Sequence, residues 1–155
     1  MTAVQNAAVT DEVDKNLAFL TYGLLFFSVF FAGVPALIAV AIAYARRKDT
    51  DTMVRGHHAF QIWIFWVGFM LALLAGAAGL SAIMITVGAA VHQASVANWH
   101  GWGSLELSQV VGPTTLSFAA TFILLYVCAS LWTLSASAYG FVRLASNRPM
   151  RQSRR

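Results

Sequence analysis

The sequence has very little charge. Only 10% of its 155 residues are Asp, Glu, Lys or Arg, whereas 59% are hydrophobic. A soluble domain carries about 25% charged residues, so this chain has too few polar side chains to cover a globular surface. The composition therefore predicts a single integral membrane domain.

Cysteine is almost absent as well. Cys128 is the only cysteine and lies inside an apolar run, so an intrachain disulfide is excluded. The first apolar run is longer than the apolar region of a signal peptide, and no convincing cleavage site follows it. We therefore expect this run to stay in the membrane.

Three long runs contain no charged residue: 17–45, 59–91 and 107–142. About 20 apolar residues are enough to cross the hydrocarbon core, so each run is long enough for one helix. A break at Gly76-Ala-Ala-Gly79 would turn the second run into a hairpin and give four spans.

The distribution of basic residues favours three spans. Four basic residues lie between positions 46 and 55, five arginines lie between 143 and 155, and no Lys or Arg lies between 92 and 106. Three spans place both basic segments in the cytoplasm, as the positive-inside rule requires, whereas four would put one of them outside. The prediction is an all-α integral membrane protein with three transmembrane helices, an external N-terminus and a cytoplasmic C-terminus. Its segments are a polar N-terminal segment (1–16), a first span (17–45), a basic cytoplasmic loop (46–58), a second span (59–91), an external loop (92–109), a third span (110–142) and a basic cytoplasmic tail (143–155).

Two prolines bear on the expected helices. Pro35 lies within the first run and removes a backbone hydrogen bond, which predicts a kink near Phe31. Gly112-Pro113 precedes the third ordered helix and is typical of a helix start.

The second expected helix has two unlike faces. At about 100° per residue, one stripe is small and polar, and the opposite stripe is large and apolar. Helices in lipid associate where small residues allow close approach, so the first stripe, with the series Gly68, Ala72 and Gly76, is the expected packing face. A simpler interpretation is that Gly and Ala only reflect the composition of membrane helices. The small stripe holds His57, Gln61, Gly68, Ala72, Ala75 and Gly79, and the large stripe holds Trp63, Trp66, Val67, Met70 and Leu74.

The third expected helix carries hydroxyl groups on two faces. Such groups often bond to their own helix backbone, so each alone means little. Two small polar faces predict neighbours on both sides, either two helices of this chain or one helix and a second protein. One face holds Ser117, Thr121, Cys128 and Ser135, and the other holds Ser130, Thr133 and Ser137.

No pattern in the chain is typical of a cofactor or metal site. His57 and His58 point about 100° apart on a helix, which disfavours joint ligation of one metal, and an interfacial role is expected for them. The spacing of His92, His100 and Glu106 matches no zinc signature. We therefore assign no catalytic residue, no cofactor-binding residue and no metal ligand.

Other function classes are also disfavoured. The expected spans lack the ionisable residues of proton relays, and the chain lacks known catalytic and nucleotide-binding motifs. Its basic residues form no aromatic-interleaved patch for nucleic acid. The arginines of the tail are explained equally well by topology and by binding to anionic lipids.

One region resembles a known family. The sequence reads Tyr44-Ala-Arg46-Arg-Lys-Asp49, and then His57-His-Ala-Phe60-Gln61-Ile62 followed by Phe65-Trp66. This pattern resembles an uncharacterised family of small bacterial inner-membrane proteins, which is distantly grouped with the channel-like component of the chloroplast inner-envelope import machinery. The resemblance implies a multi-pass protein of the bacterial inner membrane. The residues that carry the motif are His57, Phe60, Gln61, Phe65 and Trp66.

The leading functional hypothesis is a non-catalytic accessory or scaffold protein that acts through helix–helix contacts. Its expected partners are membrane lipids, including anionic ones, and either further copies of the chain or another membrane protein. The alternative is a channel or translocation component formed by oligomerisation, and a weaker one is a cofactor-binding subunit using His57 or His92. The expected helix-packing residues are Gln61, Gly68, Ala72, Gly76, Gly79, Ser117, Thr121 and Ser135.

Overall fold

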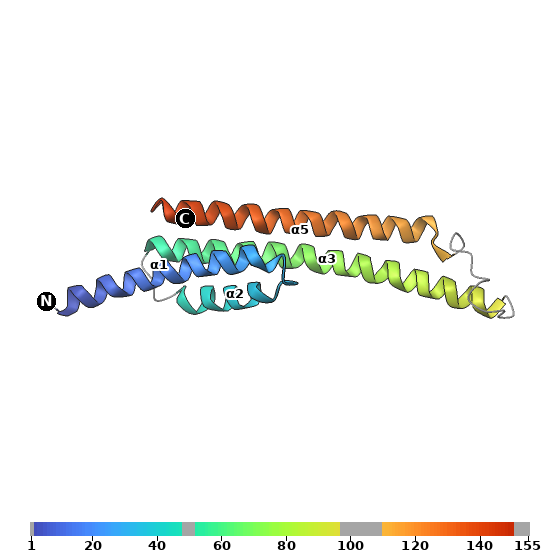
Figure 1. The fold of residues 1–155 in the computed structure, drawn as a ribbon, viewed down its shortest axis with the longest axis horizontal. Coiled ribbons are helices and arrows are strands. Elements are labelled where there is room, and N and C mark those ends of the chain that lie inside the picture. The colour runs from blue at the N-terminus through green and yellow to red at the C-terminus, as the bar shows by residue number, and fades with distance from the viewer. Residues whose placement is uncertain (1, 48–51, 97–109, 151–155) are drawn as a thin grey trace, which may run out of the picture. The chain divides into compact units, whose positions relative to one another are not determined.

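The computed structural model describes residues 2–47, 52–96 and 110–150. Within these residues the chain forms four α-helices and no β-strand, which confirms the predicted all-helical class. The helices are α1 (Thr2–Ser28), α2 (Val34–Arg46), α3 (Thr52–Val96) and α5 (Pro113–Ala145) (Figure 1).

Two of these helices are long and apolar enough to cross a membrane: α3 over Val54–Ser95, and α5. Only 17% and 11% of the residues in their most apolar stretches are buried. A core helix of a soluble protein is mostly buried, so the exposure favours a lipid environment.

The region 17–45 differs from the single kinked helix expected from the sequence. Helix α1 ends at Ser28 and α2 begins at Val34, and the two helices pack side by side (Figure 1). The backbone of Ala32 (φ 51°) and Gly33 (φ 81°) is left-handed, which a continuing right-handed helix does not allow. The Ser28 carbonyl accepts hydrogen bonds from the amides of Phe31 (3.2 Å) and Gly33 (2.8 Å).

Pro35 therefore starts a helix instead of kinking one. It is the second residue of α2 and lies two positions after the left-handed Gly33. An amide at this position has no partner within the helix, so proline loses nothing there. The antiparallel pair of α1 and α2 is called the hairpin below.

The described residues divide into two compact units. The hairpin unit comprises residues up to 69 together with those from 130 onward, and thus contains α1, α2, the first part of α3 and the last part of α5. The two-helix unit comprises residues 70–129 and contains the remaining parts of α3 and α5.

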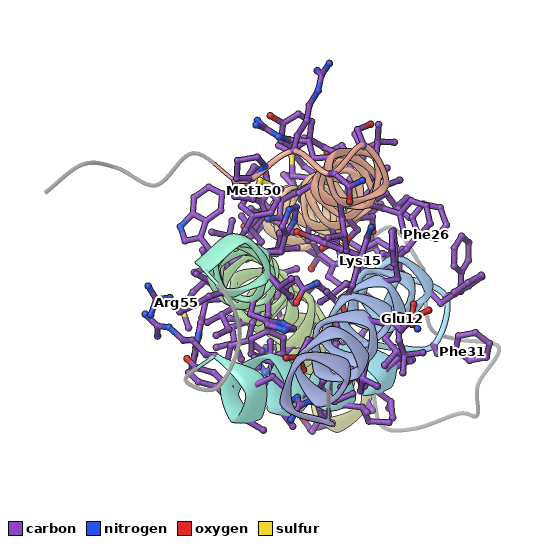
Figure 2. All side chains as sticks on the ribbon, turned by 90° about the vertical axis from the view of Figure 1, so that its left-hand side faces the viewer. Glu12, Lys15, Phe26, Phe31, Arg55 and Met150 are labelled. Carbon is purple, nitrogen blue, oxygen red and sulfur yellow. The ribbon has the colours of Figure 1, made fainter. Side chains whose placement is uncertain are left out.

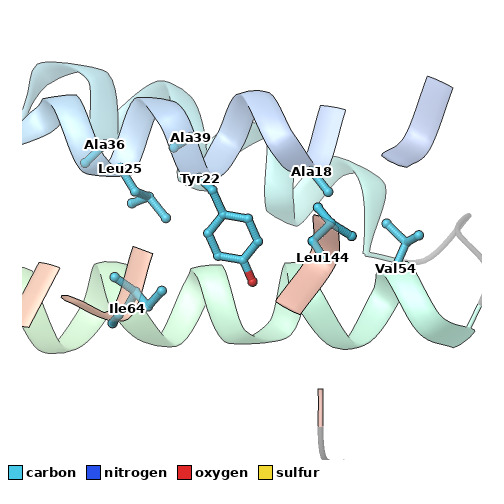
Figure 3. Packing of buried hydrophobic residues seen from close by; sticks show 9 residues of the cluster. Ala18, Tyr22, Leu25, Ala36, Ala39, Val54, Ile64 and Leu144 are labelled. Atoms are coloured by element: carbon cyan, nitrogen blue, oxygen red, sulfur yellow. The ribbon is translucent and has the colours of Figure 1, made fainter. Parts of the chain in front are cut away.

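The hairpin unit has an apolar core. Tyr22 and Leu25 of α1, Ile64 of α3 and Leu144 of α5 are each no more than 1% exposed (Figure 3). Small residues of the hairpin, such as Ala39, complete this core and allow close packing of α1 and α2. The hairpin is therefore an integral part of this unit.

Both long helices extend beyond the expected spans. Helix α3 begins at Thr52 and ends at Val96, so the last residues of the expected loop 46–58 and the first residues of the expected loop 92–109 are helical. Helix α5 ends at Ala145 and is followed by Asn147, whose left-handed backbone (φ 50°) is typical of the residue after a helix C-terminus. The Arg148 amide donates to the Arg143 carbonyl (2.9 Å). The remainder of the expected external loop, 97–109, lies outside the described residues.

Candidate functional site

The core of the hairpin unit contains a group of buried polar side chains. Tyr22 of α1 and His57, His58 and Gln61 of α3 are each 0–1% exposed. We call these four residues the polar cluster. The sequence predicted a position near the cytoplasmic water interface for His57 and His58. The structure buries both side chains within the hairpin unit, because the chain reverses at Ala32 and Gly33 and places α1 alongside the start of α3.

His57 connects three segments of the chain. Its Nε2 lies 3.2 Å from the Arg148 carbonyl, which can only accept, so Nε2 carries the proton and donates it. Its Nδ1 then accepts from the Tyr22 hydroxyl at 3.0 Å. A neutral imidazole thus satisfies both contacts and ties α1, α3 and the segment after α5 together.

Gln61 makes a second connection between α1 and α3. Its amide Nε2 donates to the Ala18 carbonyl at 2.9 Å, and its Oε1 accepts from His58 Nδ1 at 2.9 Å. The second nitrogen of His58, Nε2, is buried and has no hydrogen-bond partner among the described residues. Gln61 was expected to pack between helices, and in the structure it does so through hydrogen bonds.

Charged residues lie at one end of the hairpin unit. Asp14 of α1, only 3% exposed, forms an ion pair with Arg46 at the end of α2. Lys15 donates to the side-chain oxygen of Asn147 at 2.6 Å. The polar start of α1 therefore contacts both the end of α2 and the segment that follows α5.

Gly140 permits the close approach of α5 to Tyr22. A Cβ atom at position 140 would lie well inside contact distance of the Tyr22 ring and hydroxyl, so this position has room only for a hydrogen atom. Sequence reasoning missed both residues. The sequence offers one signal for Tyr22, which is a tyrosine within an otherwise apolar run. A buried tyrosine hydroxyl normally has a hydrogen-bond partner, so a polar contact could have been expected there.

In the structure, only some residues of the expected small-residue face of α3 contact another helix. Gly68 lies against Thr133 of α5, and Gly79 lies against the Phe122 ring, whose nearest atom would be 3.0 Å from an added Cβ. Ala72 and Gly76 are exposed, and an added Cβ at Gly76 would meet nothing within 4 Å. The series at four-residue spacing is therefore not the packing face of this chain.

Burial along α3 instead recurs at seven-residue spacing. Ala75 (2% exposed) and Ala82 (9%) are seven residues apart, and the buried Ala78 (7%) lies between them. A spacing of seven residues is typical of helices that cross at a small angle, because two turns at about 3.5 residues bring the same face back to the partner.

The hydroxyl groups singled out on α5 bond to their own helix. Ser117 donates to the Pro113 carbonyl (2.9 Å), Thr121 to the Ser117 carbonyl (2.8 Å) and Ser135 to the Leu131 carbonyl (2.6 Å). All three residues are exposed. Their hydroxyls thus contribute little to contacts between helices.

The aromatic residues of the family-like motif surround the apolar core: Phe60 and Phe65 are half-buried against it, and Trp66 is exposed. Phe60 is stacked on Trp63 (ring centroids 6.2 Å apart), and Phe65 is stacked on Phe69 (5.6 Å). Trp66 is 44% exposed and donates from Nε1 to the hydroxyl of Tyr44 in α2 at 3.0 Å. Trp66 and Tyr44 have amphipathic rings, as is typical of residues near a membrane–water interface.

In the described part of the chain, no three His, Cys, Asp or Glu side chains lie close enough to hold a metal ion. His92 is exposed near the end of α3. His100 and Glu106, which the sequence analysis considered together with His92 as possible zinc ligands, lie outside the described residues.

Comparison with known protein families, with curated proteins and with solved structures finds no match to this chain.

Proposed function

We propose that this protein is a non-catalytic accessory or scaffold protein of a membrane, and that it acts through helix–helix contacts. One observation carries this proposal: the polar groups that could do chemistry are used inside the hairpin unit to hold helices together. Tyr22, His57 and Gln61 each bond to another segment of the chain.

The outward-facing side chains support the same proposal. Large apolar residues are exposed on every described helix, including Phe27 (56%) on α1, Leu37 (57%) on α2, Leu74 (58%) on α3 and Leu124 (63%) on α5. Exposed apolar surface of this extent marks contact with a membrane or with another protein.

We further propose that the chain crosses the membrane twice, with the hairpin entering and leaving on one side. Helix α2 has 13 residues, which at 1.5 Å per residue gives about 20 Å and falls short of the ~30 Å hydrocarbon core. The apolar part of α1, residues 17–28, is equally short. Helices α3 and α5 remain as the two full spans.

This topology revises the expected three spans and external N-terminus. The Asp14–Arg46 ion pair and the Lys15–Asn147 hydrogen bond support placing the start of α1 on the same side as both basic segments. The positive-inside rule then assigns this common side to the cytoplasm.

The proposed location is the bacterial inner membrane. It rests on the resemblance carried by His57, Phe60, Gln61, Phe65 and Trp66. That resemblance supports a location and a multi-pass topology, and it adds no chemical activity.

Labelling of single cysteines tests the topology. In a Cys128→Ser background, Glu12→Cys, Arg47→Cys and Ser146→Cys are expected to react with an impermeant maleimide from one side of the membrane, and Ser95→Cys from the other. Reaction of Glu12→Cys from the side opposite to Arg47→Cys would restore the three-span topology.

Native mass spectrometry after extraction in mild detergent tests the scaffold proposal. We expect the wild-type chain in a defined assembly. Ala72→Leu enlarges an exposed position and is expected to weaken an assembly that uses this face, whereas Ala120→Leu, at an exposed position of α5, is the size-matched control. Gly76→Leu tests the same face of α3 at a second exposed position. A monomer at every protein concentration in native-lipid nanodiscs would contradict the proposal.

A further inference from the structure

One buried nitrogen of the polar cluster has no partner. His58 is 0% exposed, and its Nε2 makes no hydrogen bond within the described residues. Gln61 Nε2 donates to the Ala18 carbonyl, so Gln61 Oε1 is the acceptor of the contact with His58 Nδ1 at 2.9 Å. His58 Nδ1 therefore carries the proton of the neutral ring, and Nε2 holds a lone pair. A proton can be added at this Nε2 without breaking a hydrogen bond of the cluster.

The other histidine of the cluster differs in this respect. His57 donates from Nε2 to the Arg148 carbonyl and accepts at Nδ1 from the Tyr22 hydroxyl. A second proton on this ring would displace the hydrogen bond from Tyr22. His57 thus links segments of the chain, whereas His58 has a basic nitrogen to spare.

Two charged groups act on the His58 ring: Asp14 of α1 and Arg46 of α2. They form the ion pair at the end of the hairpin, in which the Asp14 side chain is 4% exposed and the Arg46 side chain is 32% exposed. The neutral His58 ring adds no charge to this pair, so Arg46 balances the charge of Asp14.

The other charged side chains at this end of the hairpin unit face elsewhere. Lys15 donates to the segment that follows α5. Arg55 points outward from the start of α3 (Figure 2). Arg143 of α5 acts on His57, the neighbouring histidine of α3. A charge on the His58 ring therefore acts first on the ion pair between α1 and α2.

We propose that His58 is a proton-binding site that controls the docking of α2: when Nε2 takes up a proton, the His58 ring replaces Arg46 as the partner of Asp14. Protonation places two cations beside one largely buried carboxylate. An uncompensated charge in a buried position is strongly unfavourable, so one of the two cations has to leave.

The cation that leaves is Arg46. The His58 ring is fully buried and is held through Gln61, whereas Arg46 is the last residue of α2 and its side chain already reaches the surface. Its release loosens the end of α2. The Gln61 contact holds α1 on α3 in both protonation states, because it does not involve Nε2 of His58.

This device links the hairpin to the pH on the side of the membrane where α2 ends. Histidine is the side chain that ordinarily changes charge between pH 5 and 8, so the response falls within this range. The inference goes beyond the proposed scaffold function, and because it uses only contacts within the hairpin unit it holds for either number of spans.

Thiol labelling in lipid nanodiscs, where a soluble maleimide reaches both faces, tests the inference. In the Cys128→Ser background, Ala43→Cys reports the opening of α2, because this position is 0% exposed and lies one turn before the end of the helix. Ala45→Cys, at an exposed position of the same helix, corrects for the effect of pH on thiol reactivity. The ratio of the two labelling rates is expected to rise about tenfold from pH 8 to pH 5, because opening is then linked to the uptake of one proton.

Three variants assign the response. His58→Asn keeps a donor for Gln61 Oε1 but binds no proton, so its ratio should be the same at both pH values. Arg46→Gln removes the cation that is displaced, so its ratio should be higher at pH 8 and should no longer rise on acidification. His92→Gln is the matched control, because it changes an exposed histidine of α3 in the two-helix unit, and it should keep the full rise.

The outcomes are decisive in either direction. A wild-type ratio that does not depend on pH refutes the proposal, and so does a full rise that persists in His58→Asn or in Arg46→Gln. Loss of the rise in His92→Gln would place the titrating group in the two-helix unit and refutes it as well. If His58→Asn is not folded at pH 8 by circular dichroism, Arg46→Gln decides. None of these results changes the assignment of spans, which labelling from either side of the membrane settles separately.

Discussion

The hairpin unit and the two-helix unit hold their helices together by different means. In the hairpin unit, side chains bond across helices, as Tyr22 does to His57 and Gln61 does to the Ala18 carbonyl. In the two-helix unit, the hydroxyls of Ser81 and Thr86 bond to carbonyls of their own helix. The contact between helices there is made by small residues and rings.

This difference follows from the elements present in each unit. The hairpin unit contains two helices whose apolar parts, residues 17–28 of α1 and the 13 residues of α2, are too short to cross the hydrocarbon core, and apolar burial drives little association within lipid. Directional hydrogen bonds supply a specific site for docking the hairpin. The long helices α3 and α5 need less, because each is long enough to cross the core by itself. In the two-helix unit, Gly79 of α3 contacts the Phe122 ring of α5.

The largest effect is expected at Gly140. Substitution Gly140→Ala forces the added methyl group against the buried Tyr22 ring and should lower the free energy of unfolding by about 2–3 kcal/mol through overpacking. The matched control is Gly76→Ala, which has open space and should be neutral or stabilising by up to about 1 kcal/mol because alanine favours helix. Unfolding by SDS in mixed micelles, followed by circular dichroism, measures both.

Relief of the clash provides the counter-test for Gly140. Adding Tyr22→Leu removes the ring and should make Gly140→Ala nearly neutral relative to Tyr22→Leu alone. Equal losses from Gly140→Ala in both backgrounds would show that the contact between α1 and α5 is not the cause.

The next largest effect is expected in the polar cluster. Gln61→Leu removes the hydrogen bonds to the Ala18 carbonyl and to His58 Nδ1 and should cost about 1–2 kcal/mol of unfolding free energy. The same variant should expose the hairpin, so Ala18→Cys is expected to react faster with maleimide. Ser81→Ala is the control from the two-helix unit, where a bond within one helix is lost. Equal effects of the two substitutions would remove the distinction between the units.

The sequence predicted the two long helices well because their signal is local. Runs of more than 30 uncharged residues require a helix in lipid, since every backbone group must be satisfied within the segment. It predicted 17–45 as one helix for the same reason. The reversal at Ala32 and Gly33 depends on two consecutive left-handed residues, and an apolar run with one proline fits a kink as well as a turn.

The candidate site was harder to predict because it depends on that reversal. His57 and His58 follow a basic segment, which suggested an interface. They are buried because the reversal at Ala32 and Gly33 places α1 beside the start of α3, and because the segment after α5 contacts His57. Gln61 was assigned to packing from its position on the small stripe of α3. Its actual partner, the Ala18 carbonyl, is a backbone group with no signature in the sequence.

A smaller effect is expected at the contact of the two-helix unit. In Gly79→Ala the new methyl group meets the Phe122 ring, but this ring is 38% exposed and can move aside. The net change should be within about 1 kcal/mol, since the helix propensity of alanine offsets the contact. Gly79→Ala measured with and without Phe122→Leu checks this. A loss as large as that of Gly140→Ala would show that both units tolerate close contacts equally poorly.

The smallest effect is expected from the hydroxyl groups of α5. Ser117→Ala and Thr121→Val each remove a hydrogen bond from a side chain of α5 to the backbone of the same helix. The free energy of unfolding should therefore change by less than about 0.5 kcal/mol. If these hydroxyls lined a pore in an assembly, their loss would change ion flux in liposomes even though stability stayed the same. The scaffold proposal predicts the same low flux for wild type, Ser117→Ala and Thr121→Val. An ion flux that is present in wild type and reduced in both variants would favour the channel alternative. The exposed hydroxyls of Ser117 and Thr121 would then line a pore that forms only when several copies assemble.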